Sequence, residues 1–167
     1  HQLKALGASH NRENYALFME MGTGKSKVLV DNIAMLYDKG KINAALIIAP
    51  KGVYRNWERQ EIPIHMPDHI VHNVVTWSPA TTKKQQNENL KLFKHGEQLT
   101  IFLMNIEAFS TKKGLDIAQR FLLAHQTLMA IDESTTIKSP TARRTKNVLK
   151  LRNYAKYRRI LTGSPVT

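Results

Sequence analysis

Cysteine is absent from the 167-residue chain, so disulfides, thiolate zinc sites, iron–sulfur clusters and a cysteine nucleophile are excluded. The chain also lacks any apolar run near the ~20 residues that a membrane-spanning helix needs. Acidic residues are scarce: 13 Asp and Glu stand against 25 Lys and Arg, a net charge of +12. We therefore expect a protein of a reducing, intracellular compartment, without a membrane span and with a polyanionic partner, most often nucleic acid.

Short apolar runs alternate with helical patterns along the chain. The expected strands cover residues 15–19, 44–49, 71–76, 100–104, 128–131 and 159–162. Several are apolar on both faces, as parallel strands covered by helices on each side should be. The expected helices cover residues 25–39, a segment marked by Leu115, Ala118 and Leu122, residues 141–156, and residues 53–61, ending before Pro63. This order predicts an α/β fold, a three-layer sandwich with a mostly parallel central sheet.

The strongest local motif is EMGTGKS at residues 20–26, between an expected strand and an expected helix. Gly22 and Gly24 allow backbone N–H groups to turn inward around phosphates, and the helix N-terminus points its positive dipole end at them. Lys25 would reach the β- and γ-phosphates, and the Ser26 hydroxyl would complete a Mg²⁺ shell. The spacing predicts a phosphate-binding loop, although the strict pattern has a glycine where Met19 stands.

A second motif, LMAIDES at residues 128–134, is a hydrophobic strand that ends in two carboxylates. Such a pair is often only a solvated strand end or a helix cap. With a phosphate loop upstream, it indicates a nucleotide hydrolase. Asp132 would hold Mg²⁺, and Glu133 would orient and deprotonate the attacking water.

Taken in order, these segments and four others resemble the motifs of the first RecA-like domain of superfamily-two helicases. The chain is most similar to the Swi/Snf-related double-stranded DNA translocases. Residues 46–61 resemble motif Ia, with Pro50, Asn56, Trp57 and Glu61. The other matching segments are HQLKAL (1–6), EMGTGKS (motif I), MNIEAF at 104–109 (motif Ib), IDESTTIKS at 131–139 (motif II) and LTGSP at 161–165 (motif III).

This resemblance implies a RecA-like P-loop fold over residues 1–167 and an ATP hydrolase that moves on nucleic acid, with duplex DNA as the favoured substrate. ATP would be bound with Mg²⁺ by Gln2, Gly22, Thr23, Gly24, Lys25 and Ser26. Ser26 and Asp132 would hold the metal, and Lys25, Asp132 and Glu133 would support catalysis. Thr162 and Ser164 would couple nucleotide state to movement, and Lys51, Arg55 and Lys138 would contact nucleic acid.

In that family a second RecA-like domain supplies an arginine finger. We expect it to be missing here, so that this chain is a nearly inactive fragment of a longer protein. The divergent motifs are more typical of bacterial or phage proteins than of chromatin remodellers. A strand-separating RNA or DNA helicase and a nucleic-acid-binding module without turnover stay open as alternatives.

Three features leave their roles open. Residues 132–135 read Asp-Glu-Ser-Thr where the family has Asp-Glu-Ala-His, so the route of coupling is uncertain. The acid-free cationic run at residues 138–159 is either a solvated face or a phosphate-tracking surface. Trp57 is either a base-stacking platform or, more in keeping with its helical spacing, a packed side chain.

Overall fold

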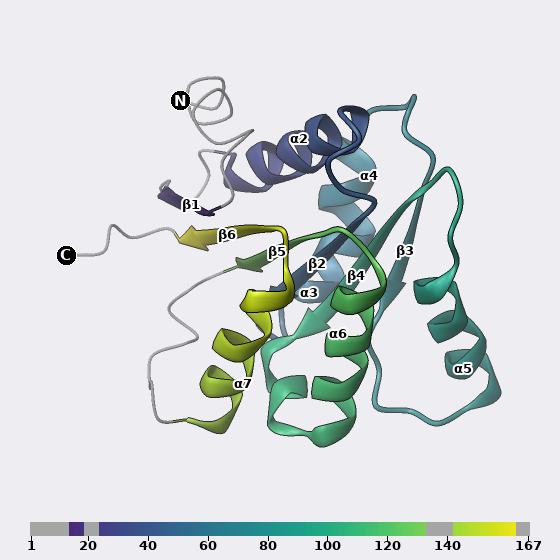
Figure 1. Ribbon diagram of the computed structural model, residues 1–167, viewed down its shortest axis with the longest axis vertical. Helices are drawn as coiled ribbons and strands as arrows, with labels where there is room; N and C mark the ends of the chain where they lie inside the picture. The colour runs from purple at the N-terminus through teal and green to yellow at the C-terminus, as the bar shows by residue number, and fades with distance from the viewer. Residues whose placement is uncertain (1–13, 19–23, 133–141, 163–167) are drawn as a thin grey trace.

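Three strands form the centre of the sheet and are buried along their whole length. They are β2 (Ala44–Ala49), β4 (Leu99–Asn105) and β5 (Thr127–Asp132). Their apolar side chains point to both faces because helices cover the sheet on each side. The computed structural model describes residues 14–18, 24–132 and 142–162 (Figure 1).

In the described part of the chain the sheet has six parallel strands, in the order β1-β6-β5-β2-β4-β3. The outer three are β1 (Asn14–Phe18), β3 (His72–Thr76) and β6 (Tyr157–Thr162). The α/β prediction and all six expected strands are confirmed, with ends that differ by at most two residues. Met19, the expected end of the first strand, lies outside the described residues.

Helices form the two outer layers (Figure 1). One face is packed by α2 (Lys25–Asp38) and α4 (Ile62–His65), and its core includes Leu29, Ile33 and Ile62. The other is packed by α6 (Lys112–Ala124) and α7 (Arg143–Leu151), around Phe102, Phe121 and Val148. Within the described residues, every helix is too short or too polar to span a bilayer. The remaining elements are α3 (Tyr54–Asn56), η1 (Trp57–Glu61), α5 (Lys83–Leu90), η2 (Lys91–Phe93), η3 (Ile106–Ser110) and η5 (Arg152–Tyr154).

The helical segment after β2 does not end before Pro63, so that expectation was wrong. After α3 the chain widens into a π turn, η1, in which the Ile62 N–H donates to the Trp57 carbonyl five residues back. The α-helical spacing returns when the Met66 N–H donates to the Ile62 carbonyl. Pro63, which has no N–H to donate, stands where one hydrogen-bond spacing gives way to the other, and the helix continues to His65.

One further helix boundary differs from the sequence-based expectation, and one helix was not among those expected. The helix expected at residues 141–156 ends at Leu151 and is followed by the short turn η5, so its predicted end was too late. The polar segment at residues 79–89 contains the start of an exposed helix, α5. Its N-cap Thr82 accepts a hydrogen bond from the Gln85 N–H at 3.2 Å.

Arg159 is not part of a cationic surface. Only 1% of the residue is exposed, and its Nε donates to Asn32 Oδ1 of α2 at 2.7 Å. Side chains alternate between faces along β6, so Arg159 and Leu161 point toward α2 whereas Ile160 is exposed. The cationic run of the sequence is therefore divided between the surface and the core.

Replacing Arg159 by Ala is expected to lower the free energy of unfolding by about 2–4 kcal/mol, because it removes a buried charged donor and leaves a cavity. Urea denaturation measures this loss. Arg158→Ala is the matched control, since Arg158 is partly exposed and bonds the Arg152 carbonyl at the surface. It should cost less than about 1 kcal/mol. Equal losses in the two variants would contradict the buried role of Arg159.

Candidate nucleotide-binding site

The start of α2 has a backbone conformation that glycine adopts far more readily than other residues. Gly24 is the N-cap residue and adopts φ 85° and ψ 29°, in the left-handed region that favours glycine. Lys25 is the first helical residue and Ser26 the second. No side chain of the described residues caps this end of the helix, and the N-terminus of a helix carries the positive end of its dipole, which favours an anion.

Lys25 and Asp132 meet at this helix end although 107 positions separate them in the sequence. Lys25 Nζ lies 3.6 Å from Asp132 Oδ1, and the two side chains are 13% and 5% exposed. Asp132 is the last residue of β5, at the carboxyl edge of the parallel sheet. An ammonium and a carboxylate therefore lie close together at this edge of the sheet, and the chemistry of this pair fits a magnesium nucleotide.

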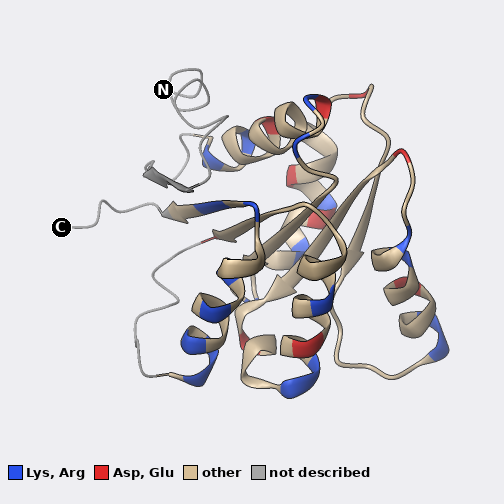
Figure 2. Cartoon of the chain, viewed as in Figure 1, with Lys and Arg blue, Asp and Glu red and all other residues tan. Residues whose placement is uncertain are grey.

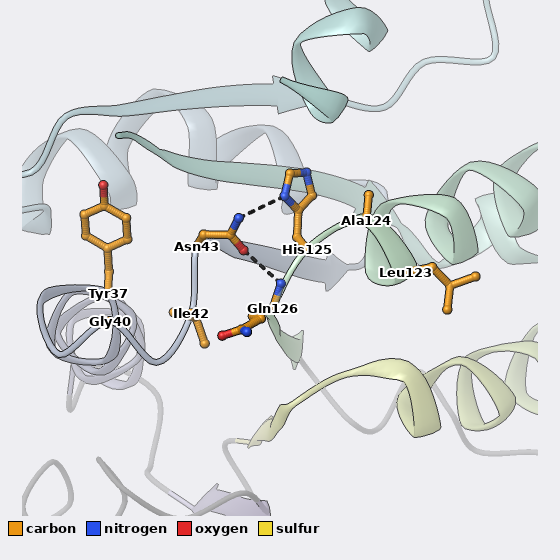
Figure 3. Close-up of a pocket in the computed structure, with 8 residues that line it drawn as sticks. All are labelled: Tyr37, Gly40, Ile42, Asn43, Leu123, Ala124, His125 and Gln126. Atoms are coloured by element: carbon orange, nitrogen blue, oxygen red, sulfur yellow. Dashed lines mark hydrogen bonds between the residues drawn. The ribbon is translucent and has the colours of Figure 1, made fainter. Parts of the chain in front are cut away.

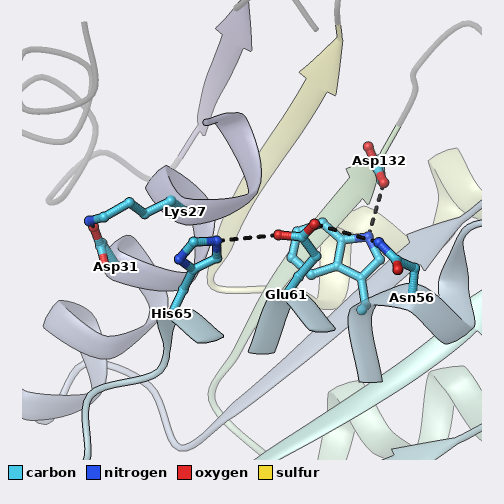
Figure 4. A network of polar contacts seen from close by, with 7 residues as sticks. Lys27, Asp31, Asn56, Glu61, His65 and Asp132 are labelled. Atoms are coloured by element: carbon cyan, nitrogen blue, oxygen red, sulfur yellow. Dashed lines mark hydrogen bonds and ion pairs between the residues drawn. The ribbon is translucent and has the colours of Figure 1, made fainter. Parts of the chain in front are cut away.

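Asp132 has a second contact on its other oxygen. The Trp57 Nε1–H donates to Asp132 Oδ2 at 2.9 Å, and the dashed line at Asp132 in Figure 4 marks this bond. Trp57 is 1% exposed, so the packed interpretation is confirmed and the base-stacking one is wrong. Sequence reasoning missed the contact with Asp132. The one available signal was that a buried indole N–H needs an acceptor.

Polar contacts hold the segment around Trp57 in place (Figure 4). Asn56 Nδ2 donates to Glu61 Oε1 at 3.5 Å, and Glu61 Oε2 lies 3.4 Å from His65 Nε2. Lys51 and Arg55 are exposed on the same segment. Lys51 and Arg55, two of the three predicted nucleic-acid residues, thus belong to the same short stretch of chain as the residue that contacts Asp132.

For the remaining predicted site residues the structure gives no side-chain geometry. Thr162 is the last residue of β6, and only its backbone is described; it pairs with Phe18. Outside the described residues lie Gln2, Gly22, Thr23, Glu133, Lys138 and Ser164. Their roles stay predictions.

A cavity of about 570 Å³ lies at the opposite edge of the sheet, where the strands begin (Figure 3). Asn43 and Gln126, which precede β2 and β5, line it, and the Gln126 N–H donates to Asn43 Oδ1 at 2.8 Å. His125 also lines it. Burial lowers the pKa of His125, and nearby His95 lowers it further, against the opposing effect of the Leu92 carbonyl. This cavity is separate from the Lys25–Asp132 site.

Comparison with known proteins identifies the family. The model of the SNF2-related domain matches residues 2–167. The chain therefore belongs to the SNF2-related domain family, whose ATPase cores have the RecA-like α/β fold seen here. A search of curated proteins found no match.

Solved structures with the same fold include two from Sulfolobus solfataricus. Its SWI2/SNF2 ATPase core in complex with dsDNA has a TM-score of 0.70 at 21% identity and is matched over 98% of this chain. The SWI2/SNF2 ATPase core domain has a TM-score of 0.68 at 22% identity over 99% of this chain. The chain spans 31% of the length of each. The UvsW helicase from bacteriophage T4 has a TM-score of 0.64 at 14% identity, over 98% of this chain and 51% of that one.

Proposed function

We propose that this domain binds ATP with Mg²⁺ and is the nucleotide-binding half of a nucleic-acid-dependent ATPase that moves on duplex DNA. The observation that supports it most directly is the convergence of Lys25 and Asp132 beside the left-handed Gly24 at the start of α2. Membership of the SNF2-related domain family supports the same activity.

In this proposal the nucleotide lies at the carboxyl edge of the sheet. Lys25 supplies a point charge to the phosphates, and the backbone N–H groups at Gly22, Thr23 and Gly24 surround them. Gln2 contacts the adenine. Bound Mg²⁺ would supply charge neutralisation to the phosphates, with Ser26 and Asp132 as the protein groups that hold it.

Glu133 follows Asp132 in the chain and is proposed as the general base that accepts a proton from the attacking water. Thr162 and Ser164, at and beyond the end of β6, are proposed to relay nucleotide state. The chain spans only 31% of the length of the two Sulfolobus ATPase cores that it matches, so hydrolysis is best measured in the full-length protein.

The nucleic-acid partner is proposed to be duplex DNA, since one matching structure is an ATPase core in complex with dsDNA. Lys51 and Arg55 are exposed on the segment after β2, as phosphate contacts need to be. Lys138 is proposed as a third contact. Figure 2 shows further Lys and Arg along α7. A surface that binds DNA phosphates along this helix is therefore a second possibility, and it is tested below.

Duplex DNA affinity is expected to fall steeply between low and physiological salt and to vary little with sequence, because phosphates rather than base edges are bound. Replacing both Lys51 and Arg55 by Ala should weaken binding roughly tenfold. It should also reduce the slope of log affinity against log salt by about 1.8, which is ~0.9 for each lost contact. Fluorescence anisotropy over a salt series measures both quantities.

The matched control replaces Lys83 and Lys84, two exposed lysines at the start of α5, and should leave the slope unchanged. A double variant of Lys146 and Lys150 tests α7, where both side chains are exposed. If only this α7 variant lowers the slope, the phosphate track lies on α7 and the assignment of Lys51 and Arg55 is wrong. DNA affinity that does not change with salt but depends on base sequence would contradict phosphate binding by either surface.

The proposed function as a whole is tested by calorimetric binding of ATP with Mg²⁺, and by phosphate release from the intact protein with and without duplex DNA. DNA-stimulated release without strand displacement supports a translocase. Strand displacement would favour a helicase. ATP binding with no release under any condition would leave a nucleic-acid-binding module without turnover.

A further inference from the structure

The two oxygens of the Asp132 carboxylate face different donors. Oδ1 lies 3.6 Å from Lys25 Nζ, and Oδ2 accepts the Trp57 Nε1–H at 2.9 Å. The Asp132 side chain is only 5% exposed and Trp57 only 1%, so water competes little for this hydrogen bond. A hydrogen bond to a buried carboxylate is stronger than one between neutral groups.

The indole differs from the lysine in what it can do. It is a donor only, it is neutral, and it cannot bind a metal or move to a phosphate. Its ring is fixed in the core between α2 and the sheet, among the apolar residues that include Leu29 and Ile62. Trp57 therefore restrains the orientation of the carboxylate without changing the charge of the site.

The local backbone around Trp57 is of a kind that often accompanies a functional site. Trp57 is the first residue of the π turn η1, and such turns occur frequently at functional sites. The Asn56–Glu61 and Glu61–His65 contacts hold the turn on either side of the indole (Figure 4).

We propose that Trp57 is a positioning residue for the nucleotide site: its indole N–H holds Asp132 in the orientation that binds Mg²⁺, and joins the segment of Lys51 and Arg55 to that carboxylate. This inference rests on the proposed function, because it assigns Asp132 to a magnesium nucleotide. Hydrogen-bond partners of metal-binding carboxylates typically change metal affinity 10–100-fold when they are removed.

The test replaces Trp57 by Phe, which removes the N–H and keeps an aromatic ring. ADP affinity is measured by calorimetry at saturating Mg²⁺ and again in EDTA. We expect about tenfold weaker binding with Mg²⁺ and a change of less than about twofold without it. Trp77→Phe is the matched control, since Trp77 is buried in the core on the other face of the sheet, and it should change neither affinity.

Fluorescence gives a second readout with the indole intact. The chain has two tryptophans, so in the Trp77→Phe variant Trp57 is the only one. Saturating Mg²⁺ and ADP should shift its emission, because the charge beside the indole N–H changes. ADP in EDTA should shift it much less. In the Trp57→Phe variant, the emission of Trp77 should stay unchanged.

The outcomes separate the two proposals. If the unaltered protein binds magnesium nucleotide but Trp57→Phe binds it equally well, or loses affinity equally with Mg²⁺ and with EDTA, the positioning role is wrong and the proposed function stands. An unchanged Trp57 emission on binding would also overturn the positioning role. If the unaltered protein binds no magnesium nucleotide, the proposed function fails and this inference fails with it.

Discussion

Replacing Glu133 by Gln is expected to lower ATP turnover by roughly 100-fold or more while ATP affinity stays within about twofold. The amide has nearly the same shape as the carboxylate, so it can still occupy the site. It cannot accept the proton that the attacking water must lose. Single-turnover phosphate release from the intact protein, together with calorimetric ATP affinity, separates chemistry from binding.

The control for this substitution is Glu88→Gln on α5, where the carboxylate pairs with Lys91 at the surface and is remote from β5. Its turnover should match that of the unaltered protein. Turnover of Glu133→Gln within about threefold of the unaltered protein would rule out the general-base role, since general-base catalysis typically contributes at least ~100-fold. A parallel loss of ATP affinity would instead assign Glu133 to binding.

Lys25→Ala is expected to weaken ATP binding at least tenfold, about 1.4 kcal/mol or more. The ammonium lies beside Asp132 at the N-terminus of α2, where it can neutralise phosphate charge that backbone N–H groups only partly offset. Calorimetry with ATP and Mg²⁺ measures the effect directly.

Lys27→Ala is the matched control for this prediction. Lys27 lies two residues further along α2, is 45% exposed on its side chain and pairs with Asp31 on the same helix. Both variants lose one positive charge from the same helix, but only Lys25 faces Asp132. ATP affinity that is unchanged in Lys25→Ala, or lowered equally in both variants, would contradict the assignment of the phosphate loop.

Local patterns were sufficient for much of the fold. The strands β2, β4 and β5 were predictable because each is a short apolar run bounded by polar residues, and burial on both faces leaves that signature in the sequence. The motif at residues 20–26 also predicted that Gly24 needs glycine's backbone freedom, and its left-handed conformation agrees with that expectation.

Long-range contacts were not predictable in this way. Trp57 meets Asp132 across 75 positions, and Arg159 meets Asn32 across 127. From the sequence, Arg159 belonged to a continuous cationic run, because composition does not show on which face of a strand a residue lies. In the sequence, Pro63 indicated the end of a helix. The helix continues past it through a π turn, and whether such a turn forms depends on how the segment packs.

The sequence by itself therefore determined the elements and the motifs of the proposed nucleotide site, since both depend on residues close together in the chain. The motifs assigned Lys25 and Asp132 to one site, but they did not show how close the two side chains lie. The tertiary structure decided which side chains meet: β5 lies between β6 and β2, and this order brings Asp132 to the end of α2 and above the helical segment of Trp57. Strand order sets such contacts because parallel strands bring their carboxyl ends to one edge of the sheet, however far apart they are in the chain.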